Sequence, residues 1–271
     1  MPRYPKQDDP KGKKVIPSVT EIISDCTDSK GWAMPYVANQ SCEWIRQNCP
    51  WDTWEDDLSD GYYTVTENDL RKKHRGEKDY PNNARYAHKH HSQKALDVGS
   101  EVHGLVEEYL KDVLSGKEPD AYTFICTTKN EQVQNAFIAF SKWAEDNELK
   151  PISIERTVYG NGWAGTLDFF GYLNGKLYVL DWKSSKALYP EMRYQIAAYR
   201  SETPRMKQID QSDDKENWVE TGCGILRLDK ETGMPEFKDT SKSYEKDLSI
   251  FNAMVELYFA RHPIIRKNAG R

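Results

Sequence analysis

Two acidic residues and a lysine lie near the ends of neighbouring strand candidates. Asp168 belongs to "AGTLDFFGYL", whereas Asp181 and Lys183 close "KLYVLDWK". Alternate residues of an extended chain share a face, so Asp181 and Lys183 point to the same side as Leu177 and Val179. An acid and a base that end an apolar stripe are typical either of a simple ion pair or of a reactive site.

The dipeptide Asn174-Gly175 between these segments predicts a β-hairpin. The two strands would then run antiparallel, with Asp168 and Asp181 at one end of the pair. Two adjacent carboxylates repel and raise each other's pKa unless a cation lies between them. Mg²⁺ or Mn²⁺ is expected there, because hard ions prefer oxygen ligands. Lys183 would orient a water molecule or stabilise charge developing on a phosphate.

Two predicted helices carry further polar residues. Gln195 and Tyr199 are four apart in "YQIAAYR" and so share one helical face. Upstream, Gly99, His103 and Glu107 recur at every fourth position in "VGSEVHGLVEEYL". Each set also has an ordinary explanation, namely packing with a surface hydrogen bond for Gln195 and Tyr199, and a satisfied half-buried histidine for His103.

The helices and strands that must position these residues can be predicted from the spacing of apolar residues, which changes from helical to strand-like along the chain. Apolar residues at helical spacing are followed by three strand candidates, a helix, a further strand and a closing helix. This order predicts an α/β domain whose mixed sheet contains a meander of three strands. The predicted helices are 17–25, a mostly helical segment over 30–48 that is interrupted at Pro35, a long helix from the second half of 70–94 to about 115, and 130–147, 189–202 and 243–262. The predicted strands are 152–160, 163–173, 176–183 and 218–229.

The motifs Gly-x-x-x-His, Gly-x-x-Asp, Asp-x-Lys and Gln-x-x-x-Tyr occur in this order on helix, strand, strand and helix. The ordered set resembles the RecB-like branch of the PD-(D/E)XK nuclease superfamily, including its stand-alone phage and CRISPR-type exonucleases. The resemblance extends over roughly residues 15–230. It implies a restriction-endonuclease-like core, with a central mixed β-sheet flanked by helices in αβββαβ order. We expect a helical and basic N-terminal lobe over 1–95, the nuclease core over 96–262 and a basic tail over 263–271.

The resemblance also assigns roles to individual residues. The residues that it implies for the metal are His103, Asp168, Asp181 and the backbone carbonyl of Trp182. Those that it implies for catalysis are Lys183, Asp181, Asp168, Gln195 and Tyr199, the last two at the edge of the site and near the DNA backbone. Glu155 on the preceding strand is a weaker candidate for a second metal or a water-bridged contact, and an exposed strand acid is the alternative.

Composition limits the cofactors and the setting. The five cysteines include no CxxC pair, and only Cys223 follows the motifs, so we expect neither a zinc ribbon nor an iron–sulfur cluster. The chain has no phosphate-binding Gly-x-x-x-x-Gly-Lys-Ser/Thr loop, so no nucleotide cofactor is expected. The polar N-terminal residues lack the apolar core of a signal peptide, so we expect none, and no apolar run has membrane-spanning length. A reducing, cytoplasmic interior is the expected location.

The net charge of −5 means that a DNA partner would need local basic surface. The candidate DNA-binding residues are Arg71, Lys72, Lys73, Arg75, Arg85, Lys89, Lys94 and Lys186. A solvated helix face is the alternative for the basic run. A recombination or replication protein is a further expected partner, and the oligomeric state is open.

These features together predict a metal-dependent DNA nuclease. An exonuclease acting in replication, recombination or repair is favoured by the resemblance alone. A structure-specific endonuclease, a catalytically silent DNA-binding module and an unrelated α/β protein remain alternatives. Strand polarity, the preference for single- or double-stranded DNA and the number of ions also remain open.

Overall fold

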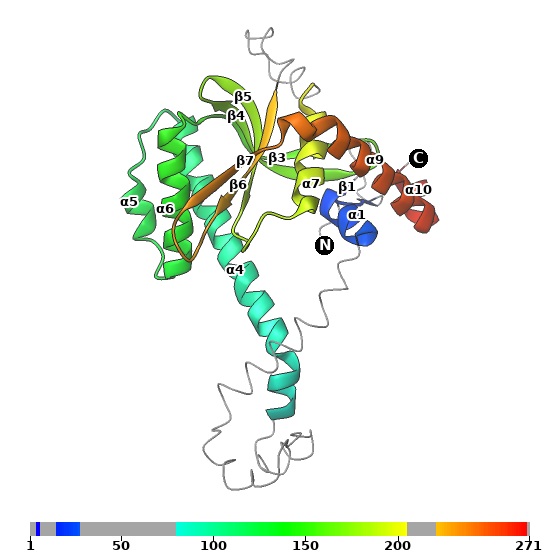
Figure 1. The fold of residues 1–271 in the computed structure, drawn as a ribbon, viewed down its shortest axis with the longest axis horizontal. Coiled ribbons are helices and arrows are strands. Elements are labelled where there is room, and N and C mark those ends of the chain that lie inside the picture. The colour runs from blue at the N-terminus through cyan, green and yellow to red at the C-terminus, as the bar shows by residue number, and fades with distance from the viewer. Residues whose placement is uncertain (1–3, 6–14, 28–79, 205–220, 270–271) are drawn as a thin grey trace. The chain divides into compact units, whose positions relative to one another are not determined.

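A mixed β-sheet of five strands lies at the centre of the described chain (Figure 1). The computed structural model describes residues 4–5, 15–27, 80–204 and 221–269. The strands lie in the order β3-β4-β5-β6-β7, and all neighbours are antiparallel except β5 and β6. Their bounds are β3 Lys150–Tyr159, β4 Ala164–Leu173, β5 Lys176–Lys183, β6 Gly222–Leu228 and β7 Pro235–Asp239.

The hairpin between β4 and β5 turns at the predicted dipeptide. Asn174 and Gly175 have φ angles of 49° and 75°. Positive φ at both central residues is the backbone of the tight turn that fits the twist of paired strands. The predicted hairpin is therefore confirmed. It pairs β4 with β5 from the turn as far as Phe169 and Leu180.

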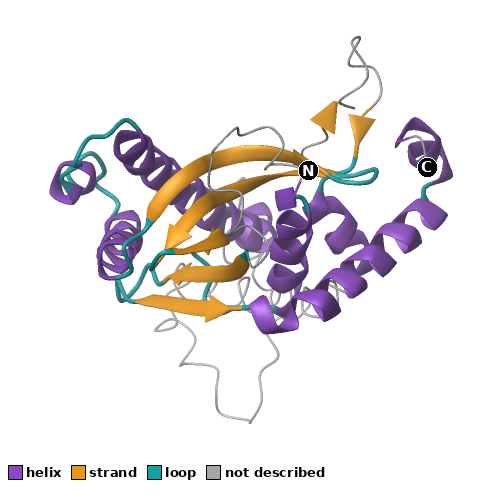
Figure 2. Ribbon diagram, turned by 90° about the horizontal axis from the view of Figure 1, so that it is seen from above, coloured by secondary structure: helices purple, strands orange, loops and turns teal. Residues whose placement is uncertain are grey.

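Helices cover both faces of the sheet, as the view from above shows (Figure 2). One apolar cluster joins the sheet to α4 and α6, and a second joins it to α1, α7 and α9. Strand β5 contributes to both clusters, with Leu177 and Val179 on one side and Leu180 and Trp182 on the other. The helices of the described chain are α1 Val19–Cys26, α4 Tyr80–Leu114, α5 Ala121–Ile125, α6 Glu131–Asp146, α7 Pro190–Ser201, α9 Tyr244–Arg261 and α10 Pro263–Ala269, with a 3-10 turn at Ser241–Ser243.

Local sequence accounts for where these helices begin and end. Ser18 caps α1 by accepting a hydrogen bond from the backbone N–H of Glu21 at 3.0 Å. Asn130 caps α6 in the same way through Gln132. Gly116, with a φ of 79°, follows the end of α4, where a residue without Cβ adopts the left-handed conformation at no steric cost.

The predicted α/β class, the mixed sheet and the three-stranded meander are confirmed. The sequence missed β7, because this edge strand begins with proline and is mostly polar, as edge strands often are. It also missed α5, α10 and the two-residue strands β1 (Tyr4–Pro5) and β2 (Val15–Ile16). The expected lobe boundary at residue 95 stays a prediction, although α1 packs on α7 and α9.

The chain divides into two compact units, residues 1–28 with 98–271 and residues 29–97. The sheet and the residues of the candidate metal centre belong to the first unit. The helical segment predicted over 30–48 lies outside the described residues. Of the second unit, the structure describes only the beginning of α4. No helix among the described residues combines the length and the apolar character needed to cross a membrane.

Candidate metal centre

Asp168 and Asp181 lie at the same end of the β4–β5 hairpin, as the hairpin predicts. The last backbone pair of the ladder is Phe169 with Leu180, and the same register continued by one step sets Asp168 opposite Asp181. Both carboxylates are buried. Asp168 Oδ2 accepts a hydrogen bond of 2.8 Å from the backbone N–H of Trp182. Backbone pairing between the two strands ends at Phe169 and Leu180, and beyond it the Asp168 side chain hydrogen-bonds to the backbone of β5.

Asp181 lies in a chain of polar contacts that runs from β5 to α7. Its Oδ2 lies 2.6 Å from Lys183 Nζ, and its Oδ1 accepts a hydrogen bond of 3.2 Å from Gln195 Nε2. Gln195 Nε2 also lies 3.2 Å from the hydroxyl of Tyr199. Gln195 and Tyr199 therefore share the helical face that the sequence predicts. Tyr199 is almost fully buried, so its hydroxyl supports Gln195 from inside the protein.

The glycine of the Gly-x-x-Asp motif makes room for this tyrosine. A Cβ added to Gly165 would lie 2.5 Å from Tyr199 Cε1 and 2.8 Å from its hydroxyl oxygen. Gly99 has a related role on α4, because an added Cβ would lie 3.2 Å from Ser184 Oγ, next to Lys183. Both motif glycines thus allow a helix to approach the strands that carry the acids and the lysine.

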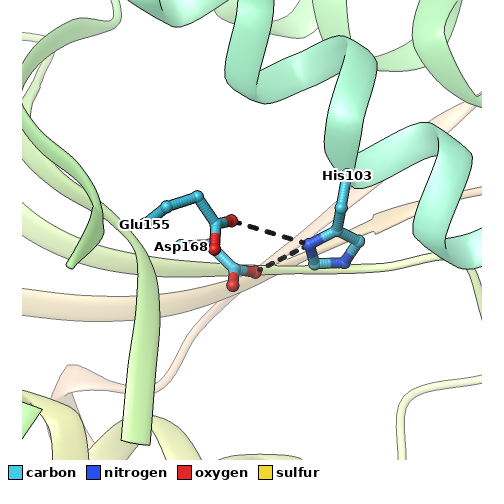
Figure 3. A group of neighbouring side chains, drawn as sticks. All are labelled: His103, Glu155 and Asp168. Atoms are coloured by element: carbon cyan, nitrogen blue, oxygen red, sulfur yellow. Dashed lines mark ion pairs between the residues drawn. The ribbon is translucent and has the colours of Figure 1, made fainter. Parts of the chain in front are cut away.

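His103 on α4 faces two carboxylates from the sheet (Figure 3). Its Nδ1 lies 3.8 Å from Asp168 Oδ2 and 4.0 Å from Glu155 Oε1. One atom from each of the three residues lies within 4.8 Å of the other two. Two ligands of one ion, each bonded at about 2.0–2.3 Å, lie no more than roughly 4.5 Å apart. The group therefore has nearly the spacing of a metal site.

Asp181 is not part of that tight group. Its two oxygens face Lys183 and Gln195 instead. Oδ2 is buried and accepts no hydrogen bond of good geometry, so the neighbouring ammonium group is its main compensation. Glu155, in contrast, belongs to the group, although it was only a weaker candidate in the sequence analysis.

Glu155 lies opposite Asp168 in the β3–β4 register, at a point where the backbone of β3 is irregular. Glu155 has a φ of 44°, in the left-handed region that non-glycine residues rarely adopt. The β3–β4 ladder passes from the pair of Ile154 with Phe169 directly to the pair of Arg156 with Leu167. Sequence periodicity assumes regular strands and contains no signal for this irregular residue.

Charge interactions change the pKa values of the central residues. Burial acts to lower the pKa of His103, but attraction to the carboxylates of Asp168 and Glu155 outweighs it and raises the pKa to about 9. Burial, followed by repulsion from Asp181, raises the pKa of Asp168 to about 7. Burial opposes the charge on Lys183, but attraction to Asp181 outweighs it and raises the pKa of the ammonium group. The residues thus hold protons where a metal ion would supply positive charge.

The predicted DNA-binding residues are only partly described. Lys186 follows β5 and is exposed, and Lys94 is exposed on α4. Arg85 and Lys89 belong to α4, but their side chains lie outside the described part of the structure. The remaining candidates, Arg71, Lys72, Lys73 and Arg75, lie outside the described residues altogether.

No protein-family model matches the chain. No curated protein matches its sequence either. The residues of the site are therefore the basis for a functional assignment.

Proposed function

We propose that the protein is a divalent-metal-dependent deoxyribonuclease with a core of the RecB-like PD-(D/E)XK type. The main support is one arrangement of residues. His103 lies 3.8 Å from Asp168, which accepts a hydrogen bond from Trp182, the residue between Asp181 and Lys183. A histidine, two acids and a lysine from one helix and two strands therefore meet at one end of the β4–β5 hairpin.

The residues fit a divalent ion by their chemistry. His103 offers a ring nitrogen, and Asp168 and Asp181 offer carboxylate oxygens, which together suit Mn²⁺ or Mg²⁺. The buried Asp181 Oδ2 faces the ammonium group of Lys183 at 2.6 Å, so an ion bound there would share this carboxylate with the lysine. We assign the ion to His103, Asp168 and Asp181 with the Trp182 carbonyl. When bound, such an ion lowers the pKa of a water ligand and neutralises charge on a phosphate.

The other residues of the site have distinct tasks. Lys183 is partly exposed, so its ammonium group can donate to a phosphate oxygen or to the attacking water while it remains paired with Asp181. Gln195 fixes the orientation of the Asp181 carboxylate, and Tyr199 holds Gln195 in turn. The N–H of Trp182 holds Asp168 Oδ2, the oxygen that faces His103, and so orients this carboxylate toward the histidine.

Within the nucleases we propose an exonuclease, because the ordered motifs resemble the stand-alone exonucleases of this branch. The test is a time course with Mn²⁺ or Mg²⁺ on linear and circular DNA, single- and double-stranded, with either end labelled. An exonuclease shortens linear DNA from an end and leaves covalently closed circles intact. Cleavage of circles would identify an endonuclease instead.

The essential control is a Lys183→Ala protein purified in the same way. We expect it to bind DNA but to lose cleavage by orders of magnitude. Cleavage at the wild-type rate by this variant would refute the assigned site. DNA binding without metal-dependent cleavage by the wild-type protein would favour a silent DNA-binding module.

A further inference from the structure

We propose that Glu155, a residue with left-handed backbone in the middle of β3, is an additional protein ligand of the divalent ion. This inference rests on the metal site of the proposed nuclease. It adds a ligand that the ordered motifs do not contain, because Glu155 precedes the Gly-x-x-Asp motif on another strand.

The first support is the position of the side chain. Glu155 Oε1 lies 4.0 Å from His103 Nδ1, and both belong to the group with Asp168 whose ligand atoms lie within 4.8 Å of one another. Figure 3 shows the two carboxylates on the same side of the imidazole ring. A small contraction around an ion would give bonding distances to all three residues.

The second support is that other residues already occupy the oxygens of Asp181. Lys183 lies 2.6 Å from one of them, and Gln195 donates to the other. The Glu155 side chain is about a third exposed, so it is accessible to an ion that enters from solvent. An accessible acid that faces the histidine therefore supplies a carboxylate in addition to that of Asp181, which an ion would share with Lys183 and Gln195.

The third support is the chemistry of the donor set. One imidazole nitrogen with the carboxylates of Glu155, Asp168 and Asp181 suits a first-row ion such as Mn²⁺, which accepts both nitrogen and oxygen ligands. The left-handed backbone of Glu155 also lowers the stability of the fold, because a non-glycine residue is strained in this conformation. A purely structural residue at this position would more favourably be glycine.

The test compares two substitutions at position 155. Both Glu155→Gly and Glu155→Ala remove the carboxylate, but only glycine relieves the left-handed backbone. We expect both to weaken Mn²⁺ binding in calorimetry by at least about tenfold. Mutation of residues that only hydrogen-bond to metal ligands already lowers metal affinity by about that factor. After removal of metal with EDTA, the glycine variant should melt about 2–4 °C above the alanine variant.

Glu148 provides a matched control, because it is also a glutamate with a left-handed φ, of 46°, but lies outside the group, in the turn after α6. Glu148→Gly and Glu148→Ala should show the same order of melting temperatures with Mn²⁺ affinity unchanged. Equal loss of Mn²⁺ affinity at positions 148 and 155 would overturn the assignment. So would wild-type Mn²⁺ affinity in both Glu155 variants.

These measurements separate this inference from the nuclease proposal. If wild-type protein binds Mn²⁺ in a Glu155-dependent manner but cuts no DNA, the ligand assignment stands and the nuclease proposal fails. If wild-type protein cuts DNA while both Glu155 variants keep full Mn²⁺ affinity, the nuclease proposal stands and the ligand assignment fails.

Discussion

Lys183 Nζ lies 2.6 Å from Asp181 Oδ2, and the two residues share one face of the same strand. The carboxylate is almost fully buried, whereas the lysine keeps about a fifth of its side chain exposed. The pair therefore neutralises a buried acid while it leaves a cation within reach of solvent. A strand-end ion pair and a catalytic pair have the same geometry here, so experiments must distinguish their energetics and their chemistry.

Stability should reveal how strongly Lys183 compensates Asp181. Lys183→Met leaves a buried carboxylate without its cation, and we expect a loss of up to about 3 kcal/mol in the free energy of unfolding. Adding Asp181→Asn removes that charge, so the double variant should be less destabilised than the sum of the single variants. Urea denaturation of the four proteins, in EDTA, measures the coupling. Additive single effects would mean that the two groups do not interact in solution.

The contact between Gly165 and Tyr199 makes a second prediction. Gly165→Ala places a Cβ against the buried ring, and we expect a loss of about 1–3 kcal/mol of stability from overpacking. DNA cleavage should fall as well, because Tyr199 holds Gln195 against Asp181.

Gly104→Ala is the matched control for that substitution. Gly104 lies in α4, and no atom lies within 4 Å of its added Cβ. Alanine there should raise stability by about 0.5–1 kcal/mol through helix propensity. Similar effects at the two glycines would argue against the packing explanation for Gly165.

Stability in EDTA should depend on pH with a defined sign. The pKa of Asp168 is raised to about 7 in the folded protein, and that of His103 to about 9. The folded state thus binds more protons than the unfolded chain, first at Asp168 between about pH 4 and 7 and then at His103 between about pH 6.5 and 9. The stability from both groups is present at low pH and is lost as the pH rises through these windows.

Metal binding should show the opposite trend, because the ion must displace the same protons. Mn²⁺ affinity should rise as the pH increases from about 6 to 9. Thermal denaturation across this range, with EDTA or with Mn²⁺, measures both effects. A His103→Gln variant should lose the part of the EDTA slope above about pH 7, and an unchanged slope would mean that another group titrates there.

Lys186 should contribute to DNA affinity through the phosphate backbone. It is exposed directly after the strand that carries Lys183, whereas the exposed Lys176 lies at the other end of β5. Lys186→Ala should weaken DNA binding about equally for all sequences and reduce the salt slope by about one. Lys176→Ala should leave both unchanged. Equal effects at both positions would indicate unspecific attraction.

Local sequence determined much of this protein. The Asn174-Gly175 turn, the Ser18 cap and the periodicity of the helices specify conformations through interactions between near neighbours, so they can be recognised without a structure. The hairpin in turn required Asp168 and Asp181 to meet at one end, and the four-residue spacing required Gln195 and Tyr199 to share a face. Both expectations are confirmed.

Only the tertiary structure decided which acid faces His103. Helix α4 and strand β3 are brought together by the packing of distant apolar residues, and no local spacing encodes that approach. The left-handed backbone of Glu155 is likewise held by its surroundings against its own preference. The proximity of Glu155 to His103 and Asp168 therefore depends on how the strands and the helix pack, which the sequence pattern does not specify.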